Sequence, residues 1–413
     1  MAKITPFNGL RPRPELAARV ATLPYDVVTT EEARKYRDQE YNFYHVTRSE
    51  IDLPESVDVH SQQVYDKAKE NLDAMLENGI LRTDTDPCYY IYELQMDGRA
   101  QTGLICASSV DDYLNGVIKK HEFTRPEKEL DRINHIIATK AQTGVVFLAY
   151  KDQEDVQEII EKWKQKHEPV NNFVAPDGVR HTLWVIDSYA KCAAITRLFE
   201  EEVPATYIAD GHHRAASAAK VCQQWRNLGY AISGEEAFNY FLTCIFPASQ
   251  LEILPYNRVV SDLNGLSPAA FLKKLEKDFL VEKIDGHPVQ PAVPHEFGMY
   301  LHGSWYRLIA RQGSYPEALI PSLDCSILQD NVMAKILNIE DPRTDKRIDF
   351  VGGIRGLGEL ERRVDQGGMA AAFSLYPVSI EQLFAVADSG EVMPPKSTWF
   401  EPKLRDGLVV YPV

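Results

Sequence analysis

A short apolar run that stops abruptly and passes at once into a helical pattern is the feature that most constrains the fold of this chain. Residues 205–209 (Ala-Thr-Tyr-Ile-Ala) have the length and composition of a buried strand, and Asp210-Gly211 ends it. The Ala-rich segment that starts at His212 predicts a helix directly after this turn. Strands that pass directly into helices are typical of sheets covered by helices, where ligands bind at the strand ends.

Other segments show patterns that are typical of helices and of strands. Apolar residues four apart predict a helix over about 57–78, and another helix is expected over about 154–166. Residues 89–94 and 102–107 are rich in β-forming side chains, and Asp97-Gly98 between them predicts a hairpin. Because hairpins are antiparallel, we expect an α+β (mixed α/β) fold rather than a purely parallel sheet.

The length of 413 residues exceeds the usual range of a single hydrophobic core. Pro, Asn, Asp and Gly concentrate between residues 250 and 265, which favours a domain boundary there. We therefore expect a first domain over 1–255, which contains the turn at Asp210, and a C-terminal α/β portion over 256–413.

Charge and cysteine spacing restrict the class of protein. The chain has 45 basic and 60 acidic residues, a net charge of -15, which argues against a dedicated DNA or RNA binder because neutralising phosphates needs a basic surface. A local cationic pocket for a small phosphorylated ligand stays compatible with this charge.

The six cysteines are widely spaced and predict free thiols in a reducing compartment. With no apolar signal core and no segment of membrane-spanning length, we expect a cytoplasmic protein with no membrane partner.

The predicted turn has the chemistry of an anion site. A helix N-terminus has unpaired N–H groups and the positive end of the helix dipole, which suit a phosphate. Gly211 allows close approach, and Arg214 can bind phosphate oxygens with two N–H groups. His212 and His213 could donate hydrogen bonds or transfer protons, and Asp210 suits a metal ion or the orientation of a histidine. The alternative is that Asp210 caps the helix and both histidines are ordinary polar residues.

The segment Asp210-Gly211-His212-His213-Arg214 resembles the signature of a bacterial and archaeal family of unknown function, the domain family numbered one thousand and fifteen. Four further segments fit that family in the same order along the chain. They are Leu23 to Val28, Lys120 to Thr124, Leu254 to Val260, and Met393 to Lys403. The resemblance spans nearly the whole chain.

That family is similar to the ParB/sulfiredoxin-like superfamily, which includes free-serine kinases. The resemblance implies a nucleotide-binding core with large insertions, in which a Gly-x-x-Arg turn, here Gly211 and Arg214, holds nucleotide phosphates. His121-Glu122 resembles the His-Glu pair of the kinases, whose glutamate is thought to act as a base. The second arginine of the ParB motif falls on Ala216, and the catalytic cysteine of sulfiredoxin falls on His212, so sulfinic-acid chemistry is excluded.

The segment around Glu122 is strongly cationic. Phosphoryl transfer requires neutralised charge and a carboxylate beside the attacking hydroxyl, and such a segment can supply both. The alternative is a solvated charged helix. The residues expected to support the site are His121, Thr124, Arg125, Lys128, Asp131 and Arg132.

Pro394-Pro395 fixes an extended path before Lys396 and Ser397. We expect this loop either to present Lys396 as a phosphate or carboxylate clamp, with Ser397 beside it, or to serve as a connector that packs Trp399.

These features predict a nucleotide-binding protein that transfers a phosphoryl group from ATP or ADP, with Mg²⁺, to a small hydroxyl compound. Glu122 and His212 are the expected catalytic residues, and residues 210–214 the expected phosphate site. Two alternatives stay open: a non-catalytic switch or binding module that responds to nucleotide, and a nucleotide phosphohydrolase that uses a histidine as acid and base. The expected partners are a nucleotide and a small-molecule substrate.

Overall fold

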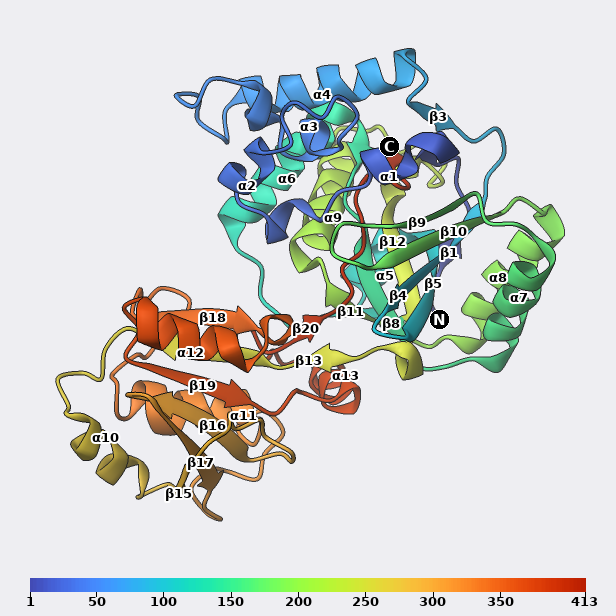
Figure 1. Cartoon of the computed structure of the whole chain (residues 1–413). Helices are drawn as coiled ribbons and strands as arrows, with labels where there is room; N and C mark the ends of the chain where they lie inside the picture. Colours follow the sequence, from blue (N-terminus) through green and yellow to red (C-terminus); the bar gives the residue numbers. More distant parts are fainter. The chain divides into compact units, whose positions relative to one another are not determined.

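The chain forms two compact units. The computed structural model describes all of residues 1–413; the first unit contains Met1–Leu251 and Pro402–Val413, and the second contains Glu252–Glu401. The chain therefore leaves the first unit once and returns to it. In Figure 1 this returning segment, in red, runs among blue and green elements.

A nine-stranded mixed sheet is the centre of the first unit. Its order is β6-β11-β8-β12-β5-β4-β10-β9, and β1 pairs with β5. The β11–β6 and β12–β8 pairs are parallel and the others antiparallel. The strands are β1 (Ile4–Thr5), β4 (Tyr89–Met96), β5 (Arg99–Ser109), β6 (Ile118–Lys119), β8 (Val146–Tyr150), β9 (Asn171–Val174), β10 (Arg180–Ile186), β11 (Thr206–Asp210) and β12 (Tyr240–Pro247). The predicted mixture of helices and strands, with a hairpin between β4 and β5, is confirmed.

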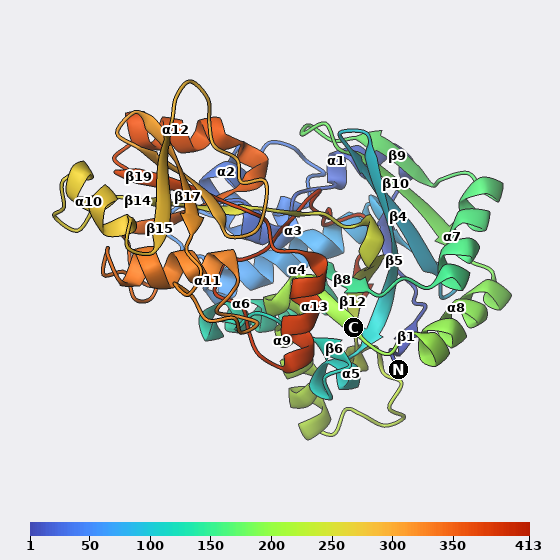
Figure 2. The same ribbon diagram turned by 90° about the horizontal axis from the view of Figure 1, so that it is seen from below.

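Helices lie on both sides of this sheet, as Figures 1 and 2 show. The longer ones are α4 (Gln62–Glu77), α6 (Pro126–Thr139), α7 (Glu154–Lys166), α8 (Tyr189–Glu202) and α9 (His212–Asn227). The shorter ones are α1 (Ala17–Val20), α2 (Thr30–Arg34), α3 (Tyr44–Thr47) and α5 (Val110–Leu114). Helix α9 is Ala-rich because it packs closely: Ala215, Ala218 and Ala219 are buried in the same core cluster as side chains of β8 and β11.

Short strand pairs complete the first unit. They are β2 (Leu10–Pro12) with β3 (Leu81–Thr83), and β7 (Ala141–Gln142) with β21 (Tyr411–Pro412). The β7–β21 pair attaches the end of the chain to this unit.

The second unit is built on a six-stranded antiparallel sheet of order β15-β17-β16-β19-β14-β18. Its strands are β14 (Tyr256–Val260), β15 (Phe279–Ile284), β16 (Glu296–Leu301), β17 (Ser304–Ala310), β18 (Ile348–Gly352) and β19 (Ala371–Leu375), with β13 (Ile253–Leu254) and β20 (Trp399–Phe400) as a separate pair. Its helices are α10 (Pro268–Leu275), α11 (Asp324–Leu328), α12 (Leu357–Gln366) and α13 (Ile380–Ser389). Leu360 of α12 packs on Val259 and Val351, so α12 covers one face of the sheet (Figure 2).

All six cysteines are buried free thiols, as their spacing predicts. None of the helices is both long enough and apolar enough to cross a membrane.

Candidate functional site

The predicted strand–turn–helix forms between β11 and α9. Strand β11 lies between β6 and β8, and the chain turns at Gly211, whose φ of 93° is in the left-handed region. A Cβ at Gly211 would lie 3.4 Å from Nη1 of Arg214, within ordinary van der Waals contact, so it is the positive φ that favours glycine here. No side chain caps the N-terminus of α9. The first amide groups of this sixteen-residue helix therefore have no side-chain acceptor.

Arg214 is held by the chain itself. Its side chain is 7% exposed, Nη1 donates to the carbonyl of Val145, and Nη2 donates to both carboxylate oxygens of Asp26 at 3.1 and 3.2 Å. Burial lowers the pKa of Arg214, but the carboxylates of Asp26 and Asp210 outweigh this penalty and hold it above its ordinary value. The guanidinium is therefore charged and fixed in orientation.

Tyr25 links Arg214 to Arg132. The guanidinium carbon of Arg132 lies 3.9 Å from the centre of the Tyr25 ring, and that of Arg214 lies 5.9 Å from it. A cavity of about 30 Å³, with these three residues among those that line it, has room for a water molecule. Solvent reaches the Asp26–Arg214 pair at Asp26, whose side chain is 34% exposed.

The carboxylate of Asp210 pairs with Lys403, whose Nζ lies 3.0 Å from Oδ2. Burial raises the pKa of Asp210, yet Lys403 and Arg214 together hold it below its ordinary value. Lys403 comes from the returning C-terminal segment, so both ends of this ion pair lie in the first unit.

His212, His121 and Glu122 come together beside the turn. The rings of His121 and His212 meet edge to face with their centres 4.5 Å apart, and Nδ1 of His212 lies 3.9 Å from Oε2 of Glu122. His212 is 5% exposed, and its Nε2 is buried without a hydrogen-bond partner. Burial holds the pKa of His212 well below its ordinary value, and burial also lowers that of His121 to about 4. Both imidazoles are therefore neutral at pH 7.

The start of α6 contacts the start of α9 through His213. Its Nε2 accepts a hydrogen bond of 3.0 Å from the backbone N–H of Arg125. The hydroxyl of Thr124 donates to Glu129, which also pairs with Lys220 of α9. Thr124 and Arg125 thus lie at the junction of the two helices, whereas Lys128 is an exposed residue of the first turns of α6.

Asp131 takes part in a different network. Its carboxylate accepts hydrogen bonds from Nδ1 of His60 and the hydroxyl of Tyr65, each 3.0 Å away, and pairs with Arg132 at 2.6 Å. Burial raises its pKa, but Arg132 and these hydrogen bonds lower it to about 2. Asp131 joins α6 to α4 and orients Arg132 on Tyr25.

Lys396 and Ser397 belong to the second unit. Their contacts there include Tyr256, Pro394 and Cys325.

Three charged residues of the first-unit site were not predicted from the sequence: Asp26, Lys403 and Asp406. Asp26 and Lys403 lie inside segments that fit the family, and this fit was the one sequence signal that could have identified them as site residues. Asp406 has no such signal; it is 1% exposed, and burial raises its pKa to about 7 in spite of Arg214 nearby.

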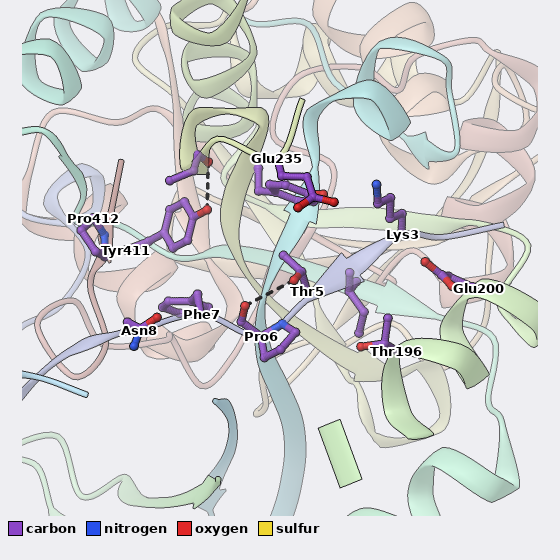
Figure 3. Close-up of a pocket in the computed structure, with 13 residues that line it drawn as sticks. Lys3, Thr5, Pro6, Phe7, Asn8, Thr196, Glu200, Glu235, Tyr411 and Pro412 are labelled. Atoms are coloured by element: carbon purple, nitrogen blue, oxygen red, sulfur yellow. Dashed lines mark hydrogen bonds between the residues drawn. The ribbon is translucent and has the colours of Figure 1, made fainter. Parts of the chain in front are cut away.

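A separate cavity of about 510 Å³ lies elsewhere in the first unit (Figure 3). Lys3 and Phe7 of the N-terminal segment, Thr196 and Glu200 of α8, and Tyr411 are among its lining residues. The hydroxyl of Tyr411 donates to the carbonyl of Ala237, one of the dashed contacts in Figure 3. No residue of the predicted site lines this cavity.

The chain matches one family model and is similar to several solved structures. The model of a family described as a protein of unknown function (DUF1015) matches residues 4–326. A free serine kinase in complex with AMP is 13% identical, with 72% of this chain and 86% of that one covered and a TM-score of 0.35. A conserved hypothetical protein from Pyrococcus furiosus is 14% identical, covers 74% and 93%, and has a TM-score of 0.36. SbnI with a C-terminal truncation, from Staphylococcus aureus, is 12% identical, covers 73% and 85%, and has a TM-score of 0.37. No curated protein matches the chain.

Proposed function

We propose a function for this chain, which belongs to the DUF1015 family. The turn between β11 and α9 binds the phosphates of ATP or ADP. The site then transfers a phosphoryl group to a small hydroxyl compound. The observation that carries the proposal is the start of α9, where Gly211 leaves the amide groups uncapped and Arg214 folds back over the turn. Uncapped amides and a guanidinium at one helix start are the donors that a phosphate group requires.

Glu122 is the residue proposed to receive the acceptor's proton. The acceptor oxygen forms a bond to the terminal phosphorus, the bond from that phosphorus to the bridging oxygen breaks, and the hydroxyl proton passes to the Glu122 carboxylate. Glu122 is suited to this because its side chain is 38% exposed and therefore open to a substrate. Neutral His212 lies beside it and adds no competing positive charge.

The proposed nucleotide would bring Mg²⁺ with it. No group of three or more His, Cys, Asp or Glu side chains in the chain is arranged to hold a metal ion by itself. Mg²⁺ at nucleotide sites needs only one or two carboxylates besides phosphates and water, and Asp210 could provide one. The ion would neutralise phosphate charge.

Two measurements on the full chain test this proposal. Calorimetric titration with ATP and ADP in the presence of Mg²⁺ measures binding, and phosphorus NMR with a panel of hydroxyl acceptors, serine included, measures transfer. We expect Arg214→Gln to weaken nucleotide binding about tenfold or more. Arg226→Gln is the matched control because Arg226 lies in the same helix but pairs with Asp111. Equal nucleotide affinities of the two variants would refute the site, and bound nucleotide with no acceptor-dependent product would refute the transfer.

The Asp26–Arg214 ion pair favours a second candidate, a nucleotide-dependent switch without turnover. A phosphate that binds Arg214 has to compete with the carboxylate of Asp26, so binding would change the contacts of the segment that carries Asp26. Nucleotide that stabilises the fold without being consumed would favour this candidate. The phosphohydrolase alternative has less support, because burial holds the pKa of His212 well below its ordinary value, which makes this imidazole a weak base and leaves it without an extra proton to donate at pH 7.

A further inference from the structure

The second unit buries an arginine that no carboxylate neutralises. Arg258 lies on β14, an interior strand between β18 and β19, and is 5% exposed. Its Nη1 donates to the carbonyl of Tyr256, and its guanidinium carbon lies 5.2 Å from the Phe350 ring. No acidic side chain lies within ion-pairing distance of it. A guanidinium has five N–H donors, so these contacts use a small part of its capacity.

The position of Arg258 explains why its charge is costly. Its neighbour Val259 packs on Leu360 of α12, and side chains alternate along a strand, so Arg258 lies on the opposite face of the sheet. Burial there lowers the pKa of Arg258, and the groups that oppose this shift are the thiol of Cys325 and the phenol of Tyr256. Buried charges in proteins are normally paired. The environment of Arg258 therefore lacks an anion.

A second cation, Lys396, lies close to Tyr256, the residue whose carbonyl binds Arg258. Lys396 has a φ of 58°, in the left-handed region that side chains other than glycine rarely adopt. Its Nζ lies 5.6 Å from the centre of the Tyr256 ring, and Tyr256 is also the residue whose carbonyl binds Arg258. Strained backbone of this kind persists only where surrounding structure holds it, and it concentrates at binding sites.

Ser397 extends this group of residues. It is 8% exposed, its hydroxyl donates to the carbonyl of Pro394 at 2.6 Å, and its oxygen lies 3.1 Å from Sγ of Cys325. Cys325 is the thiol that interacts electrostatically with Arg258. Contacts through Tyr256 and through Cys325 thus connect Arg258 with Lys396 and Ser397.

We propose that Arg258, Lys396 and Ser397 form an oxyanion site within the second unit that binds the phosphate group of a small molecule. Two cations match the charge of a phosphate, about −1.5 to −2 near pH 7, better than that of a single carboxylate. The site differs in kind from the turn at Gly211, because side chains rather than helix amides supply its donors. It does not depend on the function proposed above.

Binding of inorganic phosphate to the full chain tests the proposal, with acetate as the monoanionic comparison. The titrations use the Arg214→Gln background, so that the turn at Gly211 contributes as little as possible. We expect phosphate to bind more tightly than acetate, Arg258→Gln to weaken phosphate binding at least about tenfold, and Lys396→Met to weaken it several-fold. Lys273→Met, at an exposed lysine of α10 in the same unit, is the matched control and is expected to change nothing.

Several outcomes would overturn the site. These are no measurable phosphate binding in the Arg214→Gln background, phosphate binding that is unchanged by both Arg258→Gln and Lys396→Met, and acetate binding as tight as that of phosphate. If Arg258→Gln does not fold, Lys396→Met carries the test, because Lys396 is exposed and its replacement leaves the core intact. Arg258→Lys then separates loss of the planar fork from loss of charge.

Discussion

The carboxylate of Asp26 and the guanidinium of Arg214 form an ion pair of 3.1 Å between residues 188 positions apart in the chain. The guanidinium is almost fully buried, and the carboxylate is its solvent-facing partner. Asp26 thus occupies the side of Arg214 from which an anion would arrive. The competition between this carboxylate and a ligand phosphate is central to how the site would work.

Asp26→Asn is expected to tighten nucleotide binding. Asparagine can still accept a hydrogen bond from Arg214, but it removes the negative charge with which a phosphate has to compete. We expect an increase in affinity of about tenfold, or about 1.4 kcal/mol, by calorimetric titration. Asp111→Asn, which removes the partner of Arg226 at the far end of α9, serves as control. Weaker binding by Asp26→Asn would show that Asp26 assists the ligand.

Glu122→Gln is expected to separate binding from transfer. The amide keeps the size of the side chain but cannot accept the acceptor's proton, so transfer should fall about 100-fold or more. Nucleotide affinity should change little, because Glu122 is not among the proposed phosphate donors. Product formation followed by phosphorus NMR measures the first quantity and calorimetry the second. Glu127→Gln, at an exposed glutamate of α6, is the control, and equal loss in both variants would contradict the role of Glu122.

The buried carboxyl of Asp406 should make the stability of the folded chain depend on pH. Burial raises its pKa from 3.8 to about 7, so between these values the folded chain keeps a proton that the unfolded chain has lost. Stability contributed by this group therefore falls as pH rises through that window and levels off above it. Asp406→Asn cannot ionise, so its stability relative to wild type should rise with pH, by at most about 4 kcal/mol.

Urea unfolding at about pH 4.5 and about pH 8 measures this difference. The exposed Asp38→Asn variant is the control, for which we expect no such dependence. A relative stability of Asp406→Asn that is the same at both pH values would show that Asp406 titrates normally in the folded chain.

The buried histidines should not titrate near neutral pH. Burial lowers the pKa of His121 to about 4 and holds that of His212 well below its ordinary value, so their C2–H proton resonances should stay constant between about pH 5.5 and pH 8. His45 provides an internal comparison, because its hydrogen bond to Asp52 raises its pKa and its resonance should move in that range. Assignment uses His→Gln variants. A midpoint near 6.5 for His212 would restore it as an acid.

Local sequence signals predicted much of the first unit. The strand before Asp210, the helix after Gly211 and the hairpin at Asp97-Gly98 each depend on residues close together in the chain, and each is present. The helix expected over 154–166 is also present as α7. Such elements are predictable because turn chemistry and side-chain periodicity act over a few residues.

The pairing of distant charges could not be predicted in the same way. Lys403 and Asp210 are 193 positions apart, and no pattern within either segment specifies the other. Capping of the helix by Asp210 was one alternative that the sequence left open; in the structure the carboxylate of Asp210 pairs with Lys403 and no side chain caps α9. Asp131 was expected to support the site, yet besides the adjacent Arg132 its partners are His60 and Tyr65, from a segment much earlier in the chain.

The interrupted first unit has a consequence for the order in which the two units can fold. Residues 252–401 are contiguous, so the second unit can fold without any residue from outside this range. The first unit needs Lys403 for its ion pair with Asp210 and the strand at Tyr411 for its last strand pair. A purified chain that ends at residue 401 should therefore lose residues 1–251 to protease while the second unit survives.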